Sequence, residues 1–329
     1  MRYLHDVDAR GYSTFRLPAY FSTLWEISQV SELIGLNLTE TPLIVGEGSN
    51  SIFLQDIKRP VLRFLADGCH VDTADGQIHL HVEAGHNWHQ LVSFTVAQGW
   101  WGLENLALIP GSVGAAPVQN IGAYGVELAD CCTYVDFFEW QSREVRRLTK
   151  TECQFAYRDS VFKQQLAGKG IIVAVGLQLQ HLATPKLSYQ GLDHLASDAT
   201  IESVFQAVIA VRQSKLPDPN VLANCGSFFK NPLVSKATFT RLKNQFPQIP
   251  GYIQADGEVK LAAAWLLDQC GFKGARHGDI GCYERQPLVL VNHAAGTCAQ
   301  LSEFVAQLQA TVASKFLVML EPEVRMYRE

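Results

Sequence analysis

The stretch from Ile109 to Gly125 reads IPGSVGAAPVQNIGAYG and is the most distinctive segment of the chain. It holds four glycines, two prolines and three alanines, and its one ionisable side chain is the phenol of Tyr124. Glycine allows positive φ and lets backbone N–H groups approach a ligand closely. Consecutive N–H groups form a concavity that binds anions. The segment therefore predicts either a neutral cradle for a phosphate-bearing ligand or a small-residue turn between packed elements.

The composition is that of a globular protein. A chain of 329 residues is long enough for two domains, and its apolar content is 47%. The formal net charge is −5 and no run of Lys or Arg exceeds two residues, which argues against a nucleic-acid-binding face. No apolar run approaches the ~18 residues of a membrane span, and the N-terminus lacks the apolar region of a secretory signal. A cytoplasmic location is expected.

The cysteines and histidines favour no metal site. The eight cysteines form no C-x-x-C pair and have no histidine at zinc-like spacing, so reduced and mostly buried thiols are expected. His79 and His81 alternate along QIHLHVEAG, share one strand face and could ligate a metal. The favoured interpretation is a solvated polar face, because no Cys or carboxylate completes a recognised spacing.

The first half of the chain is rich in short strands. Strands are expected at 43–45, 52–54, 77–82, 133–139 and 171–179. One helix interrupts them, beginning after a cap at Asn87 and ending at Gly99. Its apolar face is formed by Trp88, Leu91, Val92, Thr95 and Val96.

The second half is richer in helices. We expect helices that end at Lys215, that run from about 259 to 270, and that start near Thr297, with a buried strand at 288–291. The helical apolar positions are Ile201, Val204, Phe205, Val208 and Ile209 in the first helix and Leu301, Phe304, Val305, Leu308 and Val312 in the last. The break near 181–185 predicts a domain boundary at 182/183.

Two glycine-rich loops remain as candidates for a dinucleotide site. Gly46-Glu47-Gly48 begins a G-x-G-x-x-G pattern, but Ser51 takes the third glycine position and a strand follows instead of a helix. A dinucleotide-binding βαβ unit needs a helix N-terminus at this point, so that unit is excluded. No G-x-x-x-x-G-K-[ST] occurs either. The loops 46–50 and 110–116 are left to share one dinucleotide between them.

Five motifs then occur in an order that resembles one family. They are GEGSN at 46–50, IPGSVGAAPVQNIGAYG at 109–125, YRDSVFK at 157–163, NCGSFFKNP at 224–232 and LEPEVR at 320–325. Together they resemble UDP-N-acetylenolpyruvoylglucosamine reductases, and Ser188-Tyr189 is similar to the tyrosine-bearing loop of the type I branch. The resemblance implies an α+β protein. Residues 1–182 would form a two-subdomain FAD-binding fold of the vanillyl-alcohol-oxidase/PCMH type. Residues 183–329 would form an α+β substrate-binding domain, with the tail around Glu323 reaching the active site.

The resemblance also implies a cofactor, two substrates and a reaction. NADPH would reduce non-covalent FAD, and the hydride would pass to UDP-N-acetylglucosamine enolpyruvate to give UDP-N-acetylmuramate for peptidoglycan synthesis. A monomer is expected, with no metal, nucleic acid or membrane partner. The residues implied in FAD binding are Gly46, Glu47, Gly48, Ser49, Asn50, Pro110, Gly111, Ser112, Gly114, Ala115, Gln119, Asn120, Gly122, Tyr124 and Gly125.

Three residues match the family's catalytic group. Ser227 would donate the proton, since a serine hydroxyl stays protonated at neutral pH and serves a strongly basic carbanion at close range. Arg158 would face the enolpyruvyl carboxylate with its planar fork, and Glu323 would complete the acid–base group. Without the motifs these would be a serine bonded to its own turn, an exposed arginine beside Asp159 and a solvated acid.

Six further residues match substrate-binding positions. Tyr189, Lys215 and Asn231 would hold the diphosphate and nearby groups, and Tyr252, Lys260 and Gln286 are weaker matches of the same kind. An ammonium group suits a diphosphate, which gives Lys215 the simplest physical case.

Two departures and two rival functions complete the prediction. Only six residues follow Glu323, a short tail for the family, and Cys225 lies two positions before Ser227. Cys225 is expected to be a packing residue, because no adjacent base lowers its pKa. The rivals are an alcohol or sugar oxidase of similar fold and a sugar-nucleotide sensor without chemistry. An oxidase with covalent flavin would need a His or Cys in a matching motif, and a sensor would have lost Ser227, Arg158 or Glu323.

Overall fold

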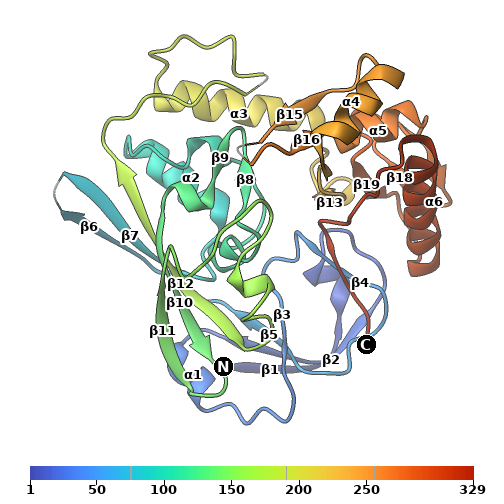
Figure 1. Ribbon diagram of the computed structural model, residues 1–329. Helices are drawn as coiled ribbons and strands as arrows, with labels where there is room; N and C mark the ends of the chain where they lie inside the picture. The colour runs from blue at the N-terminus through green and yellow to red at the C-terminus, as the bar shows by residue number, and fades with distance from the viewer. Residues whose placement is uncertain (75, 190, 255) are drawn as a thin grey trace. The chain divides into compact units, whose positions relative to one another are not determined.

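The computed structural model describes residues 1–74, 76–189, 191–254 and 256–329 and divides into two compact units (Figure 1). The first unit consists of Met1–Asp8, Tyr20–Gly48 and Asp56–Gln213, and the second of Ala9–Ala19, Ser49–Gln55 and Ser214–Glu329. This division differs from the boundary expected at 182/183. The first unit extends to Gln213, beyond the expected boundary, because the apolar face of helix α3 (Ile201–Lys215) packs in the core of that unit. The functional division at 182/183 stays a prediction.

The described residues of the first unit form two larger sheets and a two-stranded one. A mixed four-stranded sheet has the order β1-β2-β5-β3, with β2–β5 and β3–β5 parallel. A five-stranded antiparallel sheet has the order β11-β10-β12-β7-β6. The strands of the first sheet are β1 (Arg2–Asp8), β2 (Tyr20–Ile27), β3 (Leu43–Ile44) and β5 (Val61–Phe64), with α1 (Val30–Ile34) after β2. Those of the second are β6 (Cys69–Ala74), β7 (Gln77–Glu83), β10 (Cys132–Glu139), β11 (Glu144–Thr149) and β12 (Gly170–Gln180).

Helix α2 (Trp88–Ala97) forms as its sequence predicts. The Asn87 side chain accepts a hydrogen bond from the Gln90 N–H, and Gly99 follows the helix with φ +72°. All five predicted face residues are buried, and the four apolar ones share one hydrophobic core with the strands of the five-stranded sheet. Fully burying an apolar side chain of this size contributes about 1.5–3 kcal/mol. This face therefore fixes the helix beside the segment that carries the glycine-rich loop.

The glycine-rich stretch itself forms short turns and one small hairpin. Two 3₁₀ turns, Val113–Ala115 and Pro117–Gln119, precede β8 (Gly122–Ala123) and β9 (Val126–Glu127). Tyr124 and Gly125 connect these strands with φ of +49° and +80°. Positive φ at both central residues is the signature of a two-residue hairpin turn, and glycine meets it without strain.

The second unit is built on three small sheets and three helices. The sheet orders are β13-β19-β18-β17, β14-β16-β15 and β20-β4. Their strands are β4 (Ser51–Phe53), β13 (Ala223–Ser227), β14 (Leu233–Val234), β15 (Gly251–Ile253), β16 (Val259–Leu261), β17 (Arg276–His277), β18 (Ile280–Cys282), β19 (Val289–Asn292) and β20 (Arg325–Tyr327). The helices are α4 (Lys236–Gln245), α5 (Ala263–Gln269) and α6 (Cys298–Phe316). Helix α6 begins after Thr297, whose side chain accepts from the Gln300 N–H, and buries its predicted apolar face.

The start of one predicted helix is wrong. The helix expected from about 259 begins at Ala263, and Val259–Leu261 forms the central strand of the β14-β16-β15 sheet. Val259 pairs with Val234 and Ile253 on its two sides, so backbone pairing outweighs the local helical pattern.

The architecture confirms the predicted α+β class. The two larger sheets of the first unit are separate, as expected for an FAD-binding fold of two small subdomains. Among the residues that the structure describes, no helix is long and apolar enough to cross a membrane.

Candidate active site

Gly46, which begins the first of the two loops predicted to share a dinucleotide, lies beside the second loop within the first unit. A Cβ added at Gly46 would lie 2.8 Å from Ser112 Oγ and 3.8 Å from Ala115 Cβ. The Gly114 N–H donates to the Ala84 carbonyl at 2.8 Å, which anchors the second loop to the end of β7. A Cβ at Gly114 would meet Ala84 Cβ at 2.5 Å, so only glycine fits this contact.

These loops present backbone donors and little charge. Within the described parts of the chain, no acceptor bonds the backbone N–H groups of Gly46, Glu47, Gly48, Gly111 and Ser112. The one carboxylate there, Glu47, accepts from the Asn87 side-chain amide at 2.8 Å. Unused N–H groups in a neutral cradle fit an anionic diphosphate such as that of FAD.

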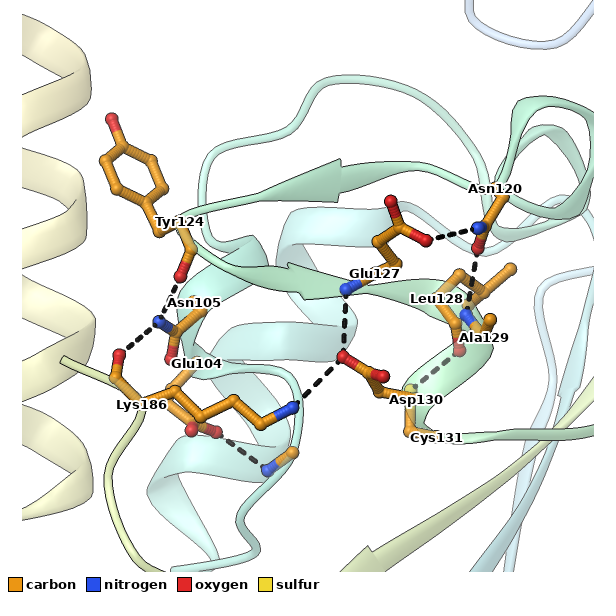
Figure 2. Close-up of polar contacts among 11 residues, drawn as sticks. Glu104, Asn105, Asn120, Tyr124, Glu127, Leu128, Ala129, Asp130, Cys131 and Lys186 are labelled. Atoms are coloured by element: carbon orange, nitrogen blue, oxygen red, sulfur yellow. Dashed lines mark hydrogen bonds and ion pairs between the residues drawn. The ribbon is translucent and has the colours of Figure 1, made fainter. Parts of the chain in front are cut away.

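The hairpin after these loops is held by Asn105 and Arg158. Asn105 donates from Nδ2 to the carbonyls of Tyr124 and Lys186, each at 2.9 Å (Figure 2). Arg158 donates from Nη2 to the Gly122 carbonyl at 2.9 Å. The Tyr189 ring packs edge-on against Tyr124, with 5.0 Å between the ring centroids. The hairpin thus joins a predicted catalytic residue and a predicted substrate residue in one unit.

Asn120 is a cofactor prediction whose side chain is engaged within the loop. Its Nδ2 donates to Glu127 at 2.7 Å, and its Oδ1 accepts from the Ala129 N–H at 2.9 Å (Figure 2). The Nδ2 also donates to the Ala156 carbonyl at 3.2 Å. The residue is fully buried and has φ +45°. Its side chain shapes the loop, and only its backbone is left to meet a ligand.

The other residues predicted to bind the cofactor lie in both units. Pro110 and Gln119 belong to the glycine-rich stretch of the first unit, whereas Ser49 and Asn50 belong to the second. Asn50 donates from Nδ2 to the Glu323 carbonyl at 3.3 Å and accepts at its own carbonyl from the Arg325 N–H at 3.0 Å. Asn50 therefore holds the segment that carries the predicted catalytic glutamate.

The second unit brings the end of β13, which carries Ser227, beside the C-terminal segment that carries Glu323. Ser227 ends β13, and the residues after it pair with the C-terminal segment. The Glu323 N–H donates to the Phe228 carbonyl at 2.8 Å, and the Lys230 N–H donates to the Glu321 carbonyl at 2.9 Å. Both predicted residues are thereby fixed by backbone hydrogen bonds between distant parts of the chain.

The Ser227 hydroxyl is left available. The residue is exposed, and no described residue forms a hydrogen bond with its side chain. The turn is instead stabilised by Asn224, whose Oδ1 accepts from the Gly226 N–H at 2.9 Å, and Gly226 has φ +69°. The alternative that the Ser227 hydroxyl bonds to its own turn is therefore wrong, since Asn224 forms that hydrogen bond.

Arg158 lies in the first unit with a left-handed backbone, φ +54°. Such a conformation is uncommon for a non-glycine residue, and it clusters at functional sites. The Lys163 ammonium donates to the Arg158 carbonyl at 2.9 Å, which stabilises the turn. The carboxylate of Asp159 accepts from the Ser160 N–H and from Gln164, so it has partners of its own.

The predicted substrate residues form one group and three separate positions. Tyr252 and Lys260 face each other across β15 and β16, and Asn231 Oδ1 accepts from the Ala263 N–H at 3.0 Å at the start of α5. Lys215 is exposed at the end of α3, and Gln286 lies in the turn before β19. Tyr189 belongs to the first unit.

The cysteine predictions are confirmed. All eight thiols are free, and five are buried. Burial raises the pKa of the Cys225 thiol to about 12, so a thiolate nucleophile is not available beside Ser227. Among the described residues, no group of three or more His, Cys, Asp and Glu could hold a metal ion.

Arg212 on α3 is a charged residue that the sequence analysis did not single out. It follows Val208 by four residues and Val204 by eight, so it lies on the same helix face as these buried residues and is itself half-buried. The arginine at this position of an apolar stripe was the signal that could have revealed it.

Two protein-family models match this chain, one in its first half and one in its second half. A family model described as "FAD binding domain" matches residues 26–147, and one described as "UDP-N-acetylenolpyruvoylglucosamine reductase, C-terminal domain" matches residues 218–327. These matches confirm FAD as the predicted cofactor and the reductase-type fold.

Curated relatives and a solved structure extend over nearly the whole chain. The UDP-N-acetylenolpyruvoylglucosamine reductase of Pasteurella multocida (strain Pm70) is 45% identical over 325 residues, covering 97% of this chain and 95% of that protein. The protein of the same name from Escherichia coli O157:H7 is 48% identical, covering 86% and 83%. The crystal structure of the reductase from Thermus caldophilus matches with a TM-score of 0.70 at 21% identity, covering 99% and 98%. The chain belongs to the UDP-N-acetylenolpyruvoylglucosamine reductase family.

Proposed function

We propose that this protein uses FAD and NADPH to reduce UDP-N-acetylglucosamine enolpyruvate to UDP-N-acetylmuramate. The observation that carries the proposal is the exposed Ser227 hydroxyl, unbonded by the described residues, on a strand whose continuation pairs with the Glu323 segment. Membership of the reductase family supports the reaction class.

The cradle of the first unit would hold FAD, which accepts a hydride from NADPH and delivers it to the enolpyruvyl group. The N–H groups at Gly46–Gly48 and Gly111–Ser112 would bind its diphosphate. Glu47 is bonded to Asn87, which reduces the repulsion that a free carboxylate would exert on the phosphates.

Ser227 would supply the proton that completes the reduction. A serine hydroxyl is a weak acid, so it can protonate the substrate carbanion only at close range and in a fixed orientation. The hydrogen bonds of Gly226 and Phe228 support this role because they hold the backbone on either side of Ser227. Glu323, fixed by its N–H to the Phe228 carbonyl, would complete the acid–base group with Ser227.

Arg158 would stabilise the negative charge that grows on the substrate carboxylate during hydride transfer. Its Nη2 is held by the Gly122 carbonyl, which gives the guanidinium a fixed position against the hairpin. Tyr189, Lys215, Asn231, Tyr252, Lys260 and Gln286 would bind the sugar nucleotide.

The test is a pair of half-reactions on purified protein. The protein should be yellow, NADPH should bleach the flavin, and UDP-N-acetylglucosamine enolpyruvate should restore the colour under nitrogen. Restoration by oxygen with no response to the sugar nucleotide would favour the oxidase alternative. Binding of the sugar nucleotide without any flavin chemistry would favour a sensor.

A monomer is also part of the proposal. The proposal assigns no role in FAD binding, substrate binding or proton transfer to a second copy of the chain. Sedimentation of the holoprotein at micromolar concentration tests this point, and a stable dimer would contradict it.

A further inference from the structure

Asn224 is a buried side chain that bonds to two separate backbone turns of the second unit. It is 4% exposed. Its Nδ2 donates to the Pro217 carbonyl at 3.1 Å and to the Leu222 carbonyl at 2.8 Å, and its Oδ1 accepts from the Gly226 N–H at 2.9 Å. A primary amide has two N–H donors and one carbonyl acceptor, so both ends of this side chain are in use.

The acceptor end of Asn224 lies at a β-bulge before Ser227. In the pairing of β13 with β19, Asn224 is opposite Val291 and Ser227 is opposite Val289, so three steps along β13 match two along β19. Gly226 lies inside the bulge with φ +69°. Bulges redirect side chains and are frequent beside active sites. The bond from the Gly226 N–H to Asn224 therefore holds this bulge one residue before Ser227.

The donor end of Asn224 holds the loop that follows Lys215. Pro217 and Leu222 lie at the two ends of this loop, and each carbonyl accepts from the same Nδ2. The Asp218 carbonyl accepts from the Leu222 N–H at 2.9 Å, which closes the loop on itself. Because the Pro217 carbonyl lies two residues after Lys215, the amide restrains the chain that carries this predicted diphosphate-binding residue.

Buried backbone groups that lose such a partner must shift or admit water. We propose that Asn224 is a positioning residue of the reaction. Its Oδ1 orients Ser227 for proton donation, and its Nδ2 places Lys215 for the diphosphate. This inference rests on the proposed function, which assigns those two roles.

Substitution can separate the two ends of the Asn224 amide. Asn224→Asp keeps an oxygen that accepts from the Gly226 N–H. A carboxyl group has no N–H and at most one O–H, so it cannot serve both the Pro217 and the Leu222 carbonyl. Asn224→Ala removes all three hydrogen bonds.

Three quantities are measured on the holoprotein. The first is the rate at which saturating UDP-N-acetylglucosamine enolpyruvate reoxidises the reduced flavin under nitrogen. The second is the Kd of UDP-N-acetylmuramate for the oxidised protein, read from the flavin absorbance. The third is the rate of flavin bleaching at saturating NADPH, which serves as an internal reference.

The two variants should differ in which quantity changes. Asn224→Asp should raise the Kd at least threefold and keep the saturated reoxidation rate within threefold of wild type, because the acceptor for the bulge is retained. Asn224→Ala should raise the Kd by as much and slow saturated reoxidation at least tenfold. Bleaching by NADPH should stay within twofold in both. Such a division separates loss of binding from loss of the chemical step.

Asn292 supplies matched controls in the same unit. It is 5% exposed, its Nδ2 donates to the Phe15 carbonyl at 3.0 Å, and its Oδ1 accepts from the Gly296 N–H at 3.0 Å. Asn292→Asp and Asn292→Ala remove the same kinds of bond from β19 and leave the bonds of Asn224 in place. Both should keep all three quantities within twofold of wild type. Effects as large as those at Asn224 would indicate a general loss of packing and overturn the inference.

Two double variants test whether Asn224 acts through the residues named. Adding Asn224→Ala to Ser227→Ala should slow reoxidation by no more than a further twofold. Adding Asn224→Asp to Lys215→Ala should raise the Kd by no more than a further twofold. A residue that acts through another loses its effect when the other is removed. The full single-variant effect in either background overturns the inference.

The single variants can also overturn it. Saturated reoxidation less than tenfold slower in Asn224→Ala does so. If that variant does not purify, Asn224→Asp decides: a Kd less than threefold above wild type, or saturated reoxidation more than threefold slower, overturns the inference. Failure of the proposed function is distinguishable, because the wild-type protein would then contain no FAD or would not be reoxidised by the sugar nucleotide.

Discussion

Replacing Gly114 with alanine tests the close packing on which the proposed FAD cradle depends. The new Cβ would lie 2.5 Å from Ala84 Cβ, 3.1 Å from the Ala84 carbonyl oxygen and 3.2 Å from its Cα. Carbon atoms prefer separations of about 3.5–4.0 Å, so the loop and the end of β7 must move apart by about 1 Å. None of these atoms belongs to a flexible side chain, and the clash cannot be relieved by a rotamer change.

Two effects of Gly114→Ala lower the free energy of unfolding. Overpacking of this kind costs about 1–3 kcal/mol. The hydrogen bond from the Gly114 N–H to the Ala84 carbonyl, 2.8 Å long, is stretched as well, and a bond of this type contributes about 1 kcal/mol. We expect the free energy of unfolding to fall by about 2–3 kcal/mol. The FAD Kd should rise at least tenfold, because the donors at Gly111 and Ser112 move with the loop.

The assay is urea unfolding of the holoprotein followed by circular dichroism, together with FAD titration by flavin fluorescence. Gly11→Ala is the control, since a Cβ there meets nothing within 4 Å. The double variant Ala84→Gly/Gly114→Ala removes the closest atom and should recover about 1–2 kcal/mol relative to the sum of the single changes. Wild-type stability and FAD affinity in Gly114→Ala, or simple additivity in the double variant, would refute the reasoning.

Three further predictions concern single side chains. Ser227→Ala should leave flavin bleaching by NADPH intact and slow reoxidation by the sugar nucleotide about 10²–10³-fold; equal losses in the two half-reactions would contradict proton donation by Ser227. Cys225→Ala should keep wild-type turnover, because burial raises the pKa of the thiol to about 12; loss of turnover with FAD retained would show a chemical role. His89 has a pKa lowered by burial, so the unfolded chain binds its proton more readily than the native protein. Stability should therefore fall as pH drops below about 6.5 toward the lower native pKa, and His89→Gln should flatten that part of the profile; an unchanged profile in urea unfolding would remove His89 as the cause.

The sequence predicted the elements whose signals are local. Asn87 and Thr297 cap helices α2 and α6 as their side-chain chemistry indicates, and the apolar stripes of both helices are buried. The adjacency of the loops at Gly46 and Ser112 was also anticipated, because both are rich in small residues and were predicted to share one dinucleotide. Local capping and periodicity are physical signals that need no knowledge of distant contacts.

What the sequence did not reveal depends on distant pairing. Val259–Leu261 looks helical in isolation but forms a strand because β14 and β15 offer backbone partners on both sides. The Ser227 hydroxyl has no partner in its own turn because the Asn224 side chain accepts the hydrogen bond from the Gly226 N–H. The sequence did not indicate which of the two side chains would stabilise the turn. The position of Arg212 near Tyr124 and Arg158 follows from the packing of helix α3, which the sequence alone did not predict.

The discontinuous second unit has a consequence for synthesis on the ribosome. Phe15, Leu17 and Ile52 leave the ribosome early, yet they are buried in a core with residues of α6. Strand β4 finds its partner only in β20, at Arg325–Tyr327. The segments that carry Phe15 and Ile52 therefore reach their final contacts only after α6 and β20 have been translated. A nascent chain stalled before residue 325 would expose apolar side chains to chaperones, however complete its first unit had become.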